Sequence, residues 1–110
     1  MKKRQDLLFC PMKAAVQIIG NKWKMLILWN IIKDKNRFGE IRKTIRTISQ
    51  KVLTQNLRML EKDKIISRKV YAEVPPRVEY TLTKLGSTLK PVIESMVAWG
   101  EKYCNNKHNK

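Results

Sequence analysis

Polar side chains gather on one face of the segment from Ser49 to Lys62. At about 100° per residue, a helix over this segment separates into an apolar face and a polar face. The apolar face carries Val52, Leu53, Leu57, Met59 and Leu60, and the polar face carries Gln50, Lys51, Thr54, Gln55 and Arg58. These amides, hydroxyl and cations can bind phosphate oxygens and base edges, and no carboxylate precedes Glu61. The pattern predicts a DNA-recognition helix capped by Ser49, although an ordinary cationic amphipathic helix explains this segment alone equally well.

Residue types for catalysis or metal binding are sparse. The sequence shows no Gly-rich phosphate loop, acid pair or nucleophile–base arrangement, so we expect no enzyme. Its two cysteines are Cys10 and Cys104, and its one histidine is His108. Together they form at most a loose metal set, so we expect neither metal nor cofactor. Two cysteines are also far from the dense disulfide framework of a small secreted protein.

Charge points to a polyanionic partner. The 110 residues carry a net charge of +15, and residues 33–69 contain twelve Lys/Arg against four Asp/Glu. Nucleic acid fits this basic balance better than a membrane surface, because no helix combines a basic face with a lipid-facing aromatic face. No apolar run could span a bilayer, and the basic N-terminus lacks a signal-peptide pattern, so we expect a cytoplasmic protein.

The elements before the recognition helix read as three helices. Residues 11–19 begin with Pro11 and end at Gly20, and Asn21 can cap a helix over residues 22–33. The second of these carries apolar residues nearly all round and is the predicted core helix; its apolar spacing comes from Trp23, Leu26, Ile27 and Ile31. After a turn at residues 34–36, a short helix over residues 38–45 and a turn at 46–48 lead into Ser49. This order is typical of a helix-turn-helix.

A hairpin follows the recognition helix. Residues 65–71 and 78–82 contain strong β-formers in partial alternation, and two prolines stiffen the loop between them. Such a hairpin, directly after a helix-turn-helix, is a wing. We expect Arg77 at its tip, with Arg68 and Lys69 at its base, to reach phosphates or the minor groove. A solvated hairpin with ordinary surface cations is the alternative. Arg37 and Lys22 are further cations that we assign to DNA contact.

The last helix is predicted over residues 84–103, with Thr83 as its cap and a kink at Pro91. Its apolar stripe is broader than a peripheral helix needs, so we expect a subunit interface built from this helix and the N-terminal one. The interface residues are Leu89, Val92, Ile93, Met96, Trp99 and Tyr103. A dimer would present two recognition helices to the half-sites of a palindrome.

The predicted fold is therefore mainly α with a small antiparallel β-hairpin, a winged helix-turn-helix that forms a homodimer through its N- and C-terminal helices. One domain covers residues 1–110. It divides into an arm at 1–9, a DNA-binding core at 10–83 with the wing at about 65–82, a dimerisation helix at 84–103 and a disordered polar tail at 104–110.

Several motifs in order carry a family resemblance. They are CPM at 10–12, IIGNKWKMLIL at 18–28, RFGEIRKTI at 37–45, ISQKVLTQNLRMLEKD at 48–63, VPPRVEYTLTKLG at 74–86 and AWG at 98–100. With them the chain resembles the HxlR-type winged-helix transcriptional regulators, distant relatives of the MarR group. The resemblance implies a dimeric repressor or activator that binds an operator, with helix 49–62 in the major groove and the wing at 71–79. Lys64 stands where the family often has Gly, which puts the end of the recognition helix in doubt.

The resemblance also suggests a response to oxidants or electrophiles. Some family members sense them through a cysteine just before the first helix, and Cys10, followed by Pro11, matches that position. The hypothesis is that Cys10 is a reactive thiol that can bridge to Cys104 of the partner subunit. Nearby cations at Lys2, Lys3, Arg4 and Lys13 would favour a thiolate. Alternatively, Cys10 is a small, partly buried apolar residue and Cys104 is a bystander.

Other functions stay open at this point. Charge alone would also suit a non-specific or architectural nucleic-acid-binding protein without a sensing role. A protein–protein module on a winged-helix fold is a further alternative, which the basic balance disfavours. A small-molecule effector is conceivable, because Trp23, Trp29 and Trp99 could line a pocket, but tryptophans are more often plain core.

Overall fold

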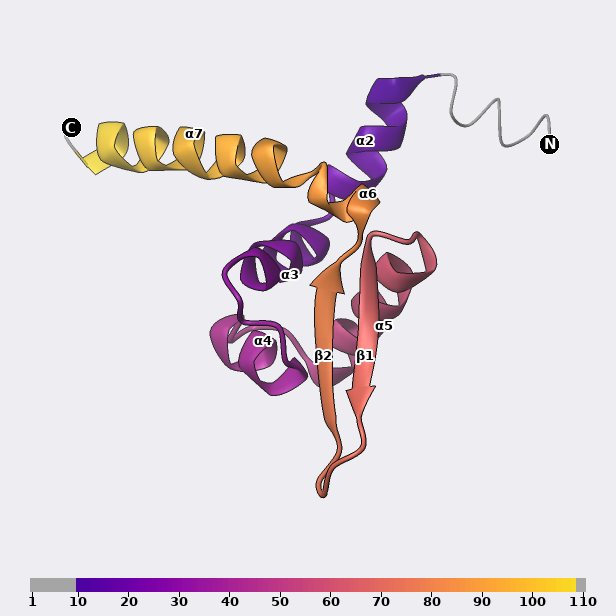
Figure 1. Ribbon diagram of the computed structural model, residues 1–110. Coiled ribbons are helices and arrows are strands. Elements are labelled where there is room, and N and C mark those ends of the chain that lie inside the picture. The colour runs from indigo at the N-terminus through magenta and orange to yellow at the C-terminus, as the bar shows by residue number, and fades with distance from the viewer. Residues whose placement is uncertain (1–9, 109–110) are drawn as a thin grey trace.

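The computed structural model describes residues 10–108, and the expected N-terminal arm lies outside the described residues. Figure 1 shows the order of the elements. The helices are α2 (Pro11–Ile19), α3 (Lys22–Ile32), α4 (Phe38–Thr44), α5 (Gln50–Lys62), α6 (Lys84–Ser87) and α7 (Lys90–His108), and the strands are β1 (Ile66–Tyr71) and β2 (Arg77–Leu82). The prediction of a mainly helical chain with one antiparallel hairpin is confirmed. Among the described helices, none is both long and apolar enough to cross a membrane.

Side-chain caps begin the core helix α3 and the predicted recognition helix α5. The Asn21 side chain accepts a hydrogen bond from the backbone N–H of Lys24 at 3.0 Å, which starts α3. Ser49 Oγ accepts from the backbone N–H of Val52 at 3.1 Å, which starts α5. Both caps satisfy a backbone donor that the first helical turn leaves free, as predicted from the residue types.

The core lies between α3, α4, α5 and the inner face of the hairpin. Its fully buried side chains are Ile27 and Leu28 of α3, Ile41 of α4, Leu53 and Leu60 of α5, and Ile66 of β1. The prediction that α3 is buried nearly all round is wrong in part. Leu26 is 42% exposed, while Trp23 and Trp29 are partly buried against the core. The other elements therefore cover only part of the circumference of α3, and the side that carries Leu26 stays open to solvent.

The hairpin pairs in a single antiparallel register. Lys69 lies opposite Glu79 and Tyr71 lies opposite Arg77, so these four residues share the outer face. The inner face packs on the core through Ile66 and Tyr80, both buried. A short third segment extends the sheet, because Arg37 forms an antiparallel bridge with Glu79. The backbone N–H of Tyr80 also donates to the carbonyl oxygen of Asn36 at 2.9 Å.

The C-terminal part forms two helices where the sequence predicted one. Thr83 caps the short α6, whose Gly86 N–H donates to Thr83 Oγ1 at 3.0 Å, and α7 begins anew at Lys90. Pro91 therefore falls in the first turn of α7, where its missing N–H is not needed and no interior kink follows. Figure 1 shows α7 extending away from the body of the molecule. It continues past Tyr103 to His108, so the expected tail is helical over 104–108, and residues 109–110 lie outside the described residues.

Candidate nucleic-acid interface

The polar face of α5 is open to solvent. Gln50, Lys51, Gln55 and Arg58 are exposed, and Thr54 is partly buried. Ser49 is exposed as well, but its hydroxyl already accepts the capping hydrogen bond from Val52. The structure thus places the side chains of this predicted set on one accessible side of one helix, with the apolar side against the core.

Two positions of α5 depart from the expected pattern. Met59, predicted on the apolar face, is exposed, and Asn56 is buried. The Asn56 side chain donates through Nδ2 to the carbonyl oxygen of Val52 at 2.8 Å, while its Oδ1 finds no partner among the described residues. A buried amide that bonds within its own helix keeps its polar group off the recognition face.

Charge around α5 is strongly positive. From α4 to the end of α5, residues 37–62 contain seven Lys/Arg against two Glu. The Glu40 carboxylate accepts from the backbone N–H of Arg37 at 3.3 Å, and the Glu61 carboxylate lies 4.0 Å from Arg68 Nε. Three further cations that the sequence analysis did not single out, Arg42, Lys43 and Arg46, are exposed on and just after α4. The high proportion of Lys and Arg in residues 37–62 could have pointed to them.

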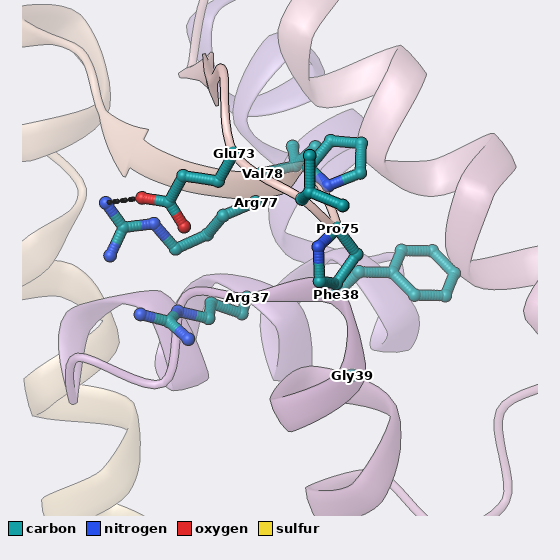
Figure 2. A pocket seen from close by; sticks show the side chains of 9 residues that line it. Arg37, Phe38, Gly39, Glu73, Pro75, Arg77 and Val78 are labelled. Carbon is teal, nitrogen blue, oxygen red and sulfur yellow. Dashed lines mark ion pairs between the residues drawn. The ribbon is translucent and has the colours of Figure 1, made fainter.

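Arg77 is not the free tip residue that the sequence suggested. It opens β2, and its guanidinium nitrogens lie 3.1 Å from a Glu73 carboxylate oxygen and 3.7 Å from one of Glu79. The guanidinium carbon also lies 3.9 Å from the centre of the Tyr71 ring. Figure 2 shows Arg77 beside Glu73, with Arg37 below them, where the wing loop faces the start of α4. The tip itself consists of residues 72–76.

The inner side of the wing is fixed by Tyr80. Burial raises the pKa of the Tyr80 hydroxyl above its usual range. The charges of Arg68 and Arg58 oppose this rise, and the charge of Glu61 adds to it. Two of these groups belong to α5 and one to β1, so Tyr80 lies where the hairpin packs on the C-terminal half of the recognition helix. This packing sets the position of the wing beside α5.

The remaining DNA-contact candidates, Arg37 and Lys22, lie at the starts of two different helices. Arg37 is exposed directly before α4, with its Nε 3.5 Å from Glu79. Lys22 opens α3, and its Nζ lies 4.4 Å from the centre of the Trp23 ring. Lys22 is exposed at the N-terminal end of α3, and the other end of this 11-residue helix leads into the turn before α4.

The predicted interface residues divide into two groups. Ile93 is 3% exposed and belongs to the core of its own chain, and Leu89 packs partly against the same core. By contrast, α7 exposes Val92, Met96, Trp99 and Tyr103, and α2 exposes Met12 and Val16. The rings of Trp99 and Tyr103 stack at 5.4 Å between centroids. Apolar surface of this extent on a helix that leaves the body of the molecule is typical of a subunit interface.

Both cysteines are free thiols and exposed. Cys10 directly precedes α2, and Cys104 lies in the last two turns of α7. In Figure 1, α2 rises above the body of the molecule and α7 runs off to the left, so the start of α2 and the end of α7 lie well apart. Of the four cations expected to activate Cys10, Lys2, Lys3 and Arg4 lie outside the described residues, and Lys13 is exposed in the first turn of α2.

A family model for the HxlR-like helix-turn-helix matches residues 18–108. The HTH-type transcriptional regulator YdeP of Bacillus subtilis (strain 168) is 52% identical over 94 residues, which cover 86% of this chain and 73% of YdeP. Among solved structures, the redox regulator HypR in its reduced form is 40% identical with a TM-score of 0.82, covering 92% of this chain and 100% of HypR. The reduced form of the transcriptional regulator YodB from B. subtilis is 40% identical with a TM-score of 0.72, covering 86% of this chain and 94% of YodB.

Proposed function

Since this chain belongs to the HxlR-like helix-turn-helix family and is a transcriptional regulator of that type, we propose that it binds a palindromic operator as a homodimer. Its relatives are regulators and not enzymes, as the sequence predicted. In the proposed complex, α5 enters the major groove and the wing, residues 71–79, lies against the neighbouring backbone.

The exposed face of α5 is the observation that carries this proposal. Gln55 and Arg58 can pair with base edges, and Lys51 can pair with a phosphate. No acid occupies this face before Glu61, which is partly buried at the far end of the helix. A solvated helix without a polyanionic partner has no need to exclude acids from two successive turns, because interspersed opposite charges would stabilise it better.

Exposed apolar side chains support the homodimer. The stacked pair of Trp99 and Tyr103 on α7 and the exposed Met12 and Val16 of α2 have no cover among the described residues. A second copy would cover them and would place two α5 helices on one side of a duplex. The spacing of the two half-sites then follows from the geometry of this interface.

Selection from a pool of random duplexes, followed by competition binding at fixed salt, tests the operator proposal. We expect a selected palindrome to bind about 10³-fold or more tightly than random DNA. Gln55→Ala and Arg58→Ala should lower this ratio, because base readout is lost. Lys102→Ala, which removes an exposed cation from α7, is the control that should leave the ratio unchanged.

Either of two outcomes would contradict the proposal and favour an alternative function. Equal affinity for all duplexes would favour the non-specific nucleic-acid-binding alternative. No binding at moderate salt would favour a protein–protein module. The salt dependence alone does not separate specific from non-specific binding, because phosphate contacts make both steep.

We also propose that the regulator responds to oxidants through Cys10. Two observations support this: the Cys10 thiol is exposed, and the relative HypR is described as a redox regulator. Because the start of α2 and the end of α7 lie well apart in one chain, the proposed bridge between Cys10 and Cys104 joins two subunits. Such a bridge requires their Cα atoms to come within about 7 Å across the dimer interface.

A further inference from the structure

Two arginines and two glutamates meet where the wing faces the start of α4. Glu79 Oε2 lies 3.5 Å from Arg37 Nε and 3.7 Å from Arg77 Nη1, and Glu73 Oε2 lies 3.1 Å from Arg77 Nη2. Figure 2 shows three of these residues, Arg37, Glu73 and Arg77, among those that line a pocket of about 420 Å³ between the wing loop and α4. We refer to Arg37, Glu73, Arg77 and Glu79 as the wing-root cluster.

Three neighbours hold the guanidinium group of Arg77. The ring of Tyr71, its cross-strand partner, has its centre 3.9 Å from the guanidinium carbon, while Glu73 and Glu79 each pair with one terminal nitrogen. Its Nε is buried without a hydrogen-bond partner among the described residues, and the whole side chain is only 30% exposed. A side chain bound in this way would have to break two ion pairs and a stacking contact before it could reach a phosphate.

Glu79 connects the wing to the helix-turn-helix through both side chain and backbone. It forms the antiparallel bridge with Arg37, and the next residue, Tyr80, donates its backbone N–H to Asn36. Arg37 in turn begins α4, where its N–H donates to Glu40. The carboxylate of Glu79 is therefore the group that touches the wing on one side and the first helix of the pair on the other.

We propose that Glu79 is a positioning residue that fixes the wing relative to α4 and α5, and that Arg77 serves DNA binding through this cluster without touching a phosphate. The inference rests on the proposed DNA-binding function. It assigns wing contacts with the duplex to exposed cations outside the cluster, such as Lys69, which shares the outer face of the hairpin.

The direction in which Glu79→Gln changes DNA affinity separates this proposal from an effect of net charge alone. Glu79→Gln removes a negative charge, so the net charge rises one unit above +15. The general field of the protein would then attract DNA more strongly. If Glu79 positions the wing, the same substitution weakens DNA binding, because Arg37 and Arg77 lose the acid between them and repel each other.

The experiment measures the dissociation constants of wild type, Glu79→Gln and Asp34→Asn for one random-sequence duplex and one selected operator at fixed salt. Asp34 is an exposed acid in the turn before α4, with a positive φ of 65° that Asn tolerates well, so Asp34→Asn is a matched control for charge. We expect Glu79→Gln to weaken binding to both duplexes by about fivefold or more, and Asp34→Asn to leave it unchanged or slightly tighter.

Arg77→Lys is the second variant. It keeps the charge but loses the planar stacking and the paired nitrogens, so a positioning role predicts weakening like that of Glu79→Gln. Hydrogen exchange supplies the readout that a change in overall stability would not produce. Exchange should accelerate at the Tyr80 amide and the wing loop in both variants, while the α5 amides stay as protected as in wild type.

Tighter or unchanged binding by Glu79→Gln, or wild-type affinity in Arg77→Lys, would overturn the inference. Unaltered exchange at the Tyr80 amide in Glu79→Gln would overturn it as well. A wild-type protein that binds neither duplex would instead refute the proposed function, and the exchange data would still decide whether Glu79 fixes the wing.

Discussion

The hydroxyl of Thr83 donates to the carbonyl oxygen of Lys64 at 2.6 Å, so the residue after β2 is tied to the second residue after α5. Lys64 adopts a positive φ of 62°, the left-handed conformation that closes many helices and that favours glycine. Lys64, which stands where the resemblance led us to expect Gly, therefore takes the left-handed conformation, and α5 nevertheless ends at Lys62 as expected.

Lys64→Gly should stabilise the protein. Relief of the left-handed strain outweighs the extra entropy of glycine in the unfolded chain, so we expect the free energy of unfolding to rise by about 0.5–1 kcal/mol. Urea denaturation at one protein concentration measures it. Lys62→Gly, in the helical last turn of α5, is the control and should lower the free energy of unfolding. A loss of stability in both variants would contradict this account.

Gly86→Ala should destabilise the fold severely. A Cβ atom at buried Gly86 would overlap the backbone carbonyl of Ile65, which also accepts the N–H of Thr83 at 3.0 Å. We expect a loss of about 1–3 kcal/mol or more in the free energy of unfolding, because backbone atoms cannot move aside cheaply. Gly39→Ala, at an exposed position of α4 with open space, should instead stabilise by up to about 1 kcal/mol. Thermal unfolding of the two variants provides the comparison.

Tyr80 should make stability depend on alkaline pH. Burial raises its pKa in the folded state above the unfolded value near 10, so folding favours the neutral hydroxyl. This contribution is complete below pH of about 10 and is lost as the pH rises through the folded-state pKa. Tyr80→Phe lacks it, so the difference in free energy of unfolding between wild type and variant should shift in favour of the variant from pH 8 to pH 11. Urea denaturation at each pH measures this difference. If it is the same at pH 8 and pH 11, Tyr80 has no such role.

Trp99→Glu should separate the subunits. Trp99 is 65% exposed on α7 and stacks on Tyr103, so a carboxylate there would be buried without a partner in the proposed interface. Sedimentation velocity should show a dimer for wild type and a monomer for the variant. Val74→Glu places the same charge on the exposed wing loop and should remain dimeric. A wild-type monomer at micromolar concentration would refute the interface.

Diamide should join two subunits covalently. The Cys10 thiol and the thiol of Cys104 of the partner subunit each lose a proton and an electron, the S–S bond forms, and diamide is reduced to its hydrazine. Non-reducing electrophoresis should show a doubled mass that Cys10→Ser and Cys104→Ser both abolish. Operator affinity should change on oxidation of wild type alone. Unchanged affinity would leave Cys10 without a sensing role.

The sequence by itself determined the local elements. The caps at Asn21 and Ser49 and the apolar spacing of α5 depend on residues within four positions of one another, so the printed chain specifies them directly. The hairpin was equally readable from its β-formers. The polar face of α5 was evident before any coordinates, because helical periodicity alone sorts its side chains.

Only the tertiary structure decided which side chains remain free to contact DNA or a second subunit. Arg77 carries the same charge in the sequence as Lys51, yet Glu73, Glu79 and Tyr71 engage it, and their approach depends on strand register and on a neighbouring helix. Ile93 likewise belongs to the stripe of α7 but is buried in its own chain. Long-range packing selects among residues that local pattern treats as equivalent, since burial and ion pairing are set by neighbours that are distant along the chain.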